Sequence, residues 1–154
     1  MYNSILVLHS LVRWLLLFSL IFAIYRAYRG WKSKSVFGVW DNRARHVTAT
    51  IAHVQLIFGL WLYFISPIVG YFFDNFHEAV HMREMRFFGM EHITMMSIAI
   101  TLLTIGSVKV KKKPTDQEKF KTMLIWYSIV LAIIFLSIPW KFSPFTARPY
   151  FRFF

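Results

Sequence analysis

The sequence predicts an all-α integral membrane protein, a bundle of four helices that cross the bilayer. Hydrophobic residues make up 57% of the 154 residues and aromatic residues 19%, whereas soluble domains are about 45–50% apolar. The mean hydropathy is +0.49. The apolar residues are gathered in four runs of roughly 20 residues, which is the helix length that crosses the hydrocarbon core of a membrane.

The four runs follow one another within a chain whose length fits a single transmembrane domain, 1–154. They lie at roughly 4–27, 46–66, 88–108 and 123–140. Pro67 and Pro139 fall at or near the ends of runs, where proline is tolerated. No basic residue precedes the first run and no small-residue cleavage site follows it, so we expect this run to be a retained helix rather than a cleaved signal.

The basic residues predict the orientation of the four spans. The net charge is +11. Six basic residues lie between the first two runs or at the end of the first (Arg26), and six separate the last two, while the other connection and the C-terminal tail together carry five and the N-terminal tip none. Loops rich in Lys and Arg stay in the cytoplasm, so both termini are expected to face outward. Because the basic residues lie between apolar runs, the charge indicates membrane topology and contact with lipid rather than nucleic-acid binding.

Two segments are expected on the outer side, the connection 67–88 and the tail 141–154. Both are rich in Phe, Tyr and Arg, which is typical of segments that lie at a membrane surface. We predict one amphipathic helix in the connection between the second and third spans. The side chains expected to dip into the membrane are Phe72, Phe73, Phe76, Val80 and Phe87.

Histidines occur in each of the first three spans. Neutral imidazoles on facing helices of a bundle can hold haem iron from two sides. At about 1.5 Å per residue, His9 and His92 each lie about 8 Å below the outer surface and His53 about 20 Å below it. Depth therefore favours His9 and His92 as the ligands of one b-type haem, with His53 as the substitute. His46, at the cytoplasmic boundary, is interpreted as a packing residue.

The same histidines have a structural alternative. An imidazole inside a membrane can simply be hydrogen-bonded in the packing between helices, and Thr50 or a polar group on another span would satisfy His53 in this way. The protein would then be a cofactor-free membrane subunit or assembly factor. Its docking surface would be the aromatic outer connection and the C-terminal tail.

Two further ionisable residues are predicted inside the membrane, Arg13 and Glu91. A charge without a partner is costly there, and the two residues lie at similar depths in the outer half. We therefore expect them to pair with each other. The functional alternative is that Arg13 binds a haem propionate or a quinone oxygen.

The outer connection also contains the H-E-x-x-H pattern at His77, Glu78 and His81. On a helix these two histidines would face one way and could hold zinc, with the glutamate as a base. A zinc protease also needs a third ligand and a substrate cleft, and this connection has only about twenty residues. The absence of cysteine excludes disulfides, thiolate metal sites and covalently attached haem.

Three segments, LHSLVRWLLL, RHVTATIAHVQLIFGLWLYF and RFFGMEHITMM, resemble those of small bacterial four-helix membrane proteins identified as cytochrome b or cytochrome b-like. The resemblance extends over nearly the whole chain, including the tail ARPYFRFF. The resemblance implies that the protein lies in the bacterial inner membrane and binds a b-type haem. His9, His53 and His92 are the residues to which it would assign a role at the haem.

A more distant similarity is to b561-type transmembrane cytochromes, which usually hold two haems with two pairs of histidines. This chain departs from them because its fourth span has no histidine. One haem is therefore expected. The function implied is that of an electron carrier or accessory subunit, working between a quinol or a larger respiratory complex and an acceptor, rather than that of a stand-alone enzyme.

Overall fold

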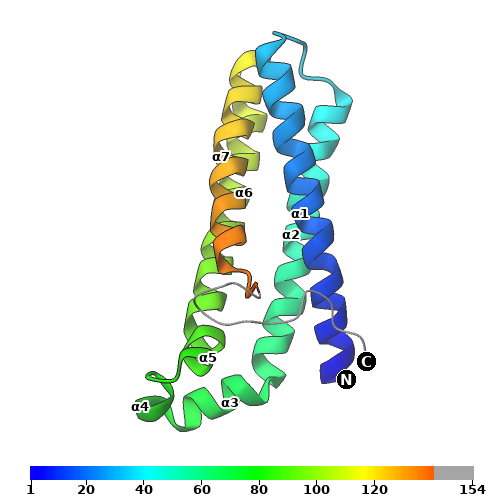
Figure 1. Ribbon diagram of the computed structural model, residues 1–154. Helices are drawn as coiled ribbons and strands as arrows, with labels where there is room; N and C mark the ends of the chain where they lie inside the picture. The colour runs from blue at the N-terminus through cyan, green and yellow to red at the C-terminus, as the bar shows by residue number, and fades with distance from the viewer. Residues whose placement is uncertain (141–154) are drawn as a thin grey trace.

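The computed structural model describes residues 1–140, and all its regular structure in that part of the chain is helical (Figure 1). The four long helices are α1 (Tyr2–Lys32), α2 (Val39–Ile65), α6 (His92–Lys112) and α7 (Asp116–Ser137). Between α2 and α6 lie α3 (Pro67–Asp74), α4 (Phe76–Ala79), α5 (Arg83–Arg86) and a π-helical turn at Phe87–Glu91. The tail 141–154, predicted to lie on the membrane, is outside the described residues.

The predicted fold class is confirmed, because four helices are long and apolar enough to cross a membrane. At the end with the basic loops, the helices run past the predicted apolar spans. The fourth begins at Asp116 rather than at 123, and the reason is a capping box. Thr115 Oγ1 accepts a hydrogen bond from Glu118 N at 3.3 Å, and Glu118 Oε2 accepts one from Thr115 N at 3.3 Å. Such reciprocal bonds satisfy free amide groups at a helix start.

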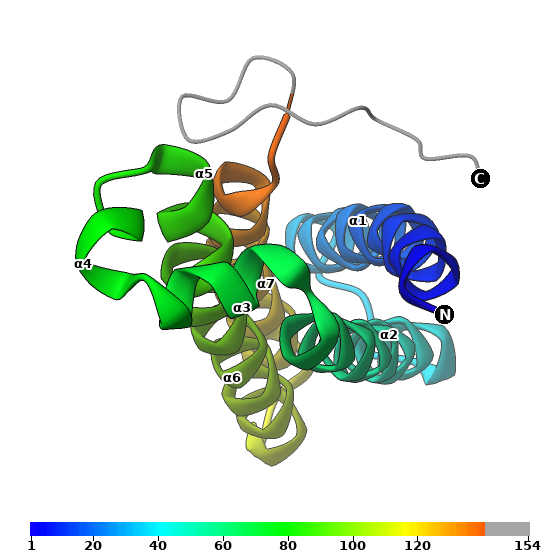
Figure 2. The same ribbon diagram turned by 90° about the horizontal axis from the view of Figure 1, so that it is seen from below.

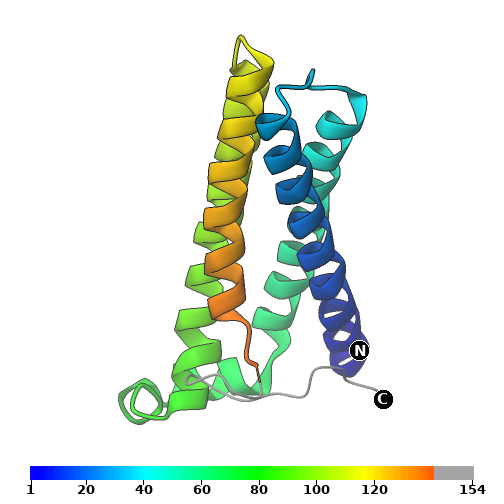
Figure 3. The same cartoon turned by 45° about the horizontal axis from the view of Figure 1, so that its top comes forward.

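The long helices form two antiparallel hairpins, α1–α2 and α6–α7. Contacts join α1 to α7 and α2 to α6, so the four helices form a closed ring (Figure 2). The two hairpins lie close together at the end with the α1–α2 and α6–α7 loops and diverge toward the other end (Figure 3). Helix α7 stops at Ser137, well before the level that α1, α2 and the segment preceding α6 reach. The bundle is therefore tight at one end and open between the hairpins at the other.

Small residues allow the tight packing of the closed end. Ala23 and Ala27 of α1 are 0% exposed, as are Leu103 of α6 and Val130 of α7. Small side chains let helix backbones approach closely where no water is present to drive apolar burial. Gly30 serves the same purpose near the end of α1, because the ring of Phe120 occupies the place that a Cβ there would take.

Arg45 ties three helices together at this end. The Arg45 side chain of α2 is only 8% exposed. Its Nη1 donates to the Ser107 carbonyl on α6 at 3.3 Å and to the Ser107 hydroxyl, and its Nη2 donates to Asn42 Oδ1 at 2.8 Å. The Tyr127 hydroxyl of α7 donates to the Arg45 carbonyl at 2.8 Å. The buried Arg45 charge therefore has neutral oxygen atoms as hydrogen-bond partners, which offset the cost of removing it from water.

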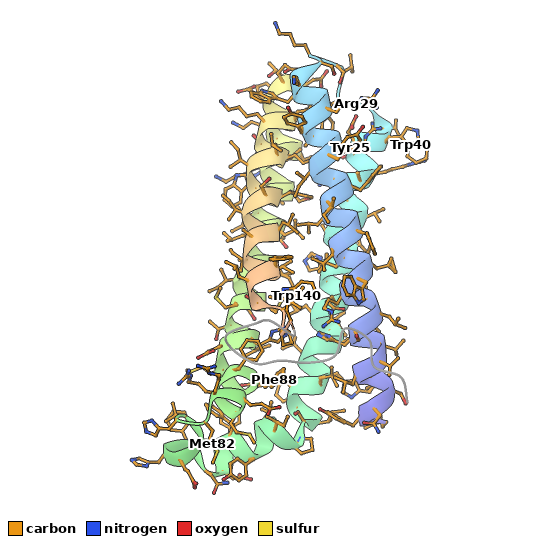
Figure 4. The ribbon with its side chains drawn as sticks, viewed as in Figure 1. Tyr25, Arg29, Trp40, Met82, Phe88 and Trp140 are labelled. Carbon is orange, nitrogen blue, oxygen red and sulfur yellow. The ribbon has the colours of Figure 1, made fainter. Side chains whose placement is uncertain are left out.

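Aromatic and basic side chains gather around the closed end. Tyr25 and Trp40 are 54% and 66% exposed, and Figure 4 shows both beside Arg29 there, whereas Met82 and Phe88 lie near the opposite end. Exposed Tyr and Trp with Arg are typical of the membrane–water interface.

The outer connection differs from the single amphipathic helix that was predicted, because it is divided among three short helices. Phe72 and Phe87 are 1% and 2% exposed, so they are buried within the protein and not in lipid. Phe72 packs against Gly89, where it occupies the place of an added Cβ. Phe73 and Phe76 remain 59% and 53% exposed. Packing against the start of the third span explains why this segment folds back as short pieces.

Candidate functional site

A cavity of about 180 Å³ lies between the two hairpins in the half of the bundle where they diverge. Most of its lining is apolar and comes from all four long helices and α3. The polar groups that reach it include those of His9, Arg13, Gln55, Tyr63 and His92. An apolar cavity with a few convergent polar groups is the usual form of a ligand site. This cavity is therefore the candidate functional site.

The structure brings two of the predicted histidines together in this cavity. His9 of α1 and His92 of α6 have ring centroids 6.5 Å apart and ring planes 72° from each other. A metal ion bonded to one nitrogen of each ring at about 2.0–2.1 Å would put the two centroids about 6 Å apart. The separation of the rings thus leaves room for one ion between them.

His92 is held by a backbone carbonyl. Its Nδ1 donates to the carbonyl oxygen of Ser137 at 3.0 Å. Ser137 is the last residue of α7, where carbonyl groups lack a partner within the helix. Because Nδ1 carries the proton, Nε2 is the basic nitrogen. This is the usual arrangement of a metal-ligating histidine, in which a carbonyl or carboxylate orients the ring.

A π-helical turn immediately precedes His92. It spans Phe87–Glu91, and the His92 amide donates to the Phe87 carbonyl to close it. The Tyr63 hydroxyl of α2 donates to the Gly89 carbonyl in this turn at 2.7 Å. A π-turn adds one residue to a helical turn and often marks a functional site. It changes the direction in which His92 points relative to the residues of α5.

His9 packs against one face of α2. The Gln55 amide nitrogen donates to the His9 carbonyl at 2.9 Å and lies 3.3 Å from His9 Nε2. One turn further along α2, a Cβ on Gly59 would come within 3.3 Å of His9 Cε1. Gly59 therefore allows α2 to approach the imidazole ring of His9 closely. His9 Nδ1 is buried without a hydrogen-bond partner among the described residues.

His53 does not line this cavity. Its Nε2 lies 3.1 Å from Thr104 Oγ1 of α6, and that hydroxyl donates to the Ile100 carbonyl at 2.8 Å. The Thr104 hydroxyl proton is already used, so His53 Nε2–H is the donor of the bond between them. His53 is thus satisfied by a polar group on another span, as the structural alternative for this residue anticipated.

Arg13 lines the cavity beside the two histidines. Its Nη2 donates to Ser10 Oγ at 3.3 Å, and its Cζ lies 5.5 Å from the ring centroid of Trp14. The predicted pairing of Arg13 with Glu91 is wrong, because the Glu91 carboxylate pairs with Arg86 at 2.6 Å. Arg86 directly precedes the π-turn and Glu91 is its last residue, and a π-turn brings residues i and i+5 together.

The residues after α7 cover one side of the cavity. Ile138 and Pro139 line it, and Trp140 folds back so that its Nε1 donates to the Phe135 carbonyl at 2.7 Å. The Trp140 and Trp14 rings have centroids 5.9 Å apart. Figure 4 shows Trp140 directly beyond the end of α7. The short fourth helix thus leaves space that these residues partly fill.

The H-E-x-x-H pattern does not form the zinc site of a regular helix. Helix α4 ends at Ala79, so His77 lies in it and His81 in the turn that follows. The two rings have centroids 6.3 Å apart on the exposed outer connection. Within residues 1–140, no group of three or more His, Asp or Glu is placed to hold a metal ion.

The two histidines at the cavity are a donor set that haem could use. A porphyrin supplies four of the iron ligands itself, so the protein needs to offer only two, on facing helices. His9 and His92 can be those two, and His92 already has the outer hydrogen bond of a ligand. Most of the lining around them is apolar, and Arg13 contributes a cationic side chain to it.

Sequence reasoning missed three groups that build this site: Gln55, the Ser137 carbonyl and Tyr63. A polar Gln within an apolar span was a usable signal for the first, because polar side chains in a bilayer face the bundle interior. A backbone carbonyl carries no signal in the sequence.

Comparison with known proteins produced no match: no family model, curated protein or solved structure is similar to this chain.

Proposed function

We propose that this protein is a b-type haem protein of the bacterial inner membrane that transfers electrons, as a small carrier or as a subunit of a respiratory complex. The observation that carries the proposal is the pair His9 and His92, on different helices, 6.5 Å apart at an apolar cavity.

His92 and His9 would hold the haem iron. His92 contributes a ring fixed by the Ser137 carbonyl at 3.0 Å, and a fixed ring is a stronger ligand than one free to rotate. Arg13, which lines the cavity, would neutralise a propionate. Haem, when bound, would accept and release one electron at a time. The apolar lining would exclude water from the two histidines. It would also favour the reduced haem, which carries less positive charge than the oxidised haem.

The excess of basic residues in the two short loops supports an orientation with those loops in the cytoplasm. The cavity then lies in the outer half of the membrane. A quinol or a larger membrane complex is the partner expected at that depth.

The test is the absorption spectrum of the detergent-purified full chain, expressed with haem supplied, before and after reduction with dithionite. The expected result is a sharp Soret band and a reduced α-band typical of b-type haem with two histidine ligands. His92→Ala should lose these bands, whereas His46→Ala, on an exposed position of α2, should keep them. A well-folded protein without a Soret band would refute the proposal.

A cofactor-free docking subunit is the second candidate, and the exposed aromatics of the outer connection favour it. Phe73 and Phe76 are 59% and 53% exposed next to half-exposed Tyr71. Under this proposal Phe73→Ser with Phe76→Ser would abolish co-purification with a membrane complex. His92→Ala would leave co-purification intact.

A further inference from the structure

The two candidate ligands are held in different ways. His92 donates from Nδ1 to the Ser137 carbonyl at 3.0 Å, which leaves Nε2 free to bond to iron. That hydrogen bond both orients the ring and raises the basicity of Nε2. The Ser137 carbonyl belongs to the backbone at the end of α7.

His9 lacks such an anchor. Within the described part of the chain, neither of its ring nitrogens donates to a carbonyl or carboxylate, and its Nδ1 is buried without a partner. Its Nε2 instead lies 3.3 Å from the Gln55 amide nitrogen, which can only donate. The lone pair that a metal would need is thus already engaged by Gln55. His9 has a stable position in which it is not a ligand.

The space around His9 is apolar and small. Leu56, Gly59 and Leu62 of α2 line this cavity, and Gly59 lies against the ring, because an added Cβ there would come within 3.3 Å of His9 Cε1. A small uncharged molecule can enter such a space without losing hydrogen bonds to water.

We propose that His92 is the permanent ligand and His9 the exchangeable one, so that the reduced protein binds a small neutral diatomic molecule such as carbon monoxide on the His9 side. This inference rests on the proposed haem function. In the exchange, the bond from His9 Nε2 to iron is replaced by the bond to the diatomic molecule, and His9 Nε2 accepts a hydrogen bond from Gln55. Both exchanging groups are neutral, so no electron or proton is transferred.

The experiment is a titration of the haem-loaded, dithionite-reduced full chain in detergent with carbon monoxide, followed by the Soret band. The wild-type band should shift with a saturable isotherm. Gln55→Leu removes the alternative partner of His9, and the affinity for carbon monoxide should fall about fivefold, the equivalent of one hydrogen bond. Gln117→Leu is the matched control at the far end of α7 and should leave the affinity unchanged.

Two further variants distinguish the role of His9 from that of His92. His9→Ala should keep haem through His92 and bind carbon monoxide at least tenfold more tightly than wild type, because no side chain competes for the iron. His92→Ala should lose haem.

The outcomes distinguish this inference from the proposal on which it rests. Bands of a haem with two histidine ligands that do not change under carbon monoxide would refute the exchange and leave the haem function standing. Retention of haem in His92→Ala with loss in His9→Ala would also overturn the assignment. A chain that takes up no haem would overturn both.

Discussion

The contact between Arg45 and Ser107 should be a measurable source of stability at the closed end of the bundle. Arg45 of α2 is 8% exposed, and its Nη1 donates to both the carbonyl and the hydroxyl of Ser107 on α6. The perturbation is a double-mutant cycle of Arg45→Met, Ser107→Ala and the two together. Methionine keeps the apolar part of the arginine side chain and removes the charge.

The magnitude follows from the kind of bond removed. A hydrogen bond to a charged group contributes about 1.5–3 kcal/mol in soluble proteins, whereas side-chain hydrogen bonds within a membrane bundle average about 0.6 kcal/mol. Arg45 is buried but lies near the end where aromatic and basic residues mark the interface. The coupling free energy between the two positions should therefore lie between these limits, at about 1–2 kcal/mol.

The assay is reversible unfolding in mixed micelles with increasing dodecyl sulfate, followed by far-ultraviolet circular dichroism. Arg43→Met is the matched control: the same substitution two residues away, at an exposed position where Arg43 lies over the ring of Trp40. It should change the free energy of unfolding by less than about 0.5 kcal/mol. Additivity of the two single variants within about 0.3 kcal/mol would refute the reasoning, because independent sites behave in that way.

Three other predictions concern single positions. Thr115→Ala should lower the free energy of unfolding by about 1 kcal/mol through loss of the α7 cap, and Thr115→Ser should restore most of it, as measured in the same micelles. Lys34, two residues after the end of α1, has φ 52°, so Lys34→Gly should raise the melting temperature; a decrease would contradict the strain argument. Thr104→Val removes the partner of His53 and should leave the haem spectrum unchanged, whereas loss of the Soret band would mean that His53 takes part in binding.

Much of the fold could be predicted from the sequence because hydrophobic length is a local property. Four runs of about 20 apolar residues require four spanning helices, since a bilayer leaves backbone groups no other partner. The start of α7 was missed by seven residues, although its Thr115–Glu118 box is visible in the sequence. The outer connection was predicted as one helix, and its burial against Gly89 could not be seen from periodicity alone.

The candidate site shows the same division between local and tertiary information. By itself the sequence determined that His9 and His92 lie at one depth, because the rise per residue along a helix is constant. Only the tertiary structure decided that their rings face each other at 6.5 Å, that His53 turns to Thr104, and that Glu91 pairs with Arg86 instead of Arg13. Depth follows from counting residues, but direction around a helix depends on how the hairpins pack and on a π-turn that shifts the register before His92.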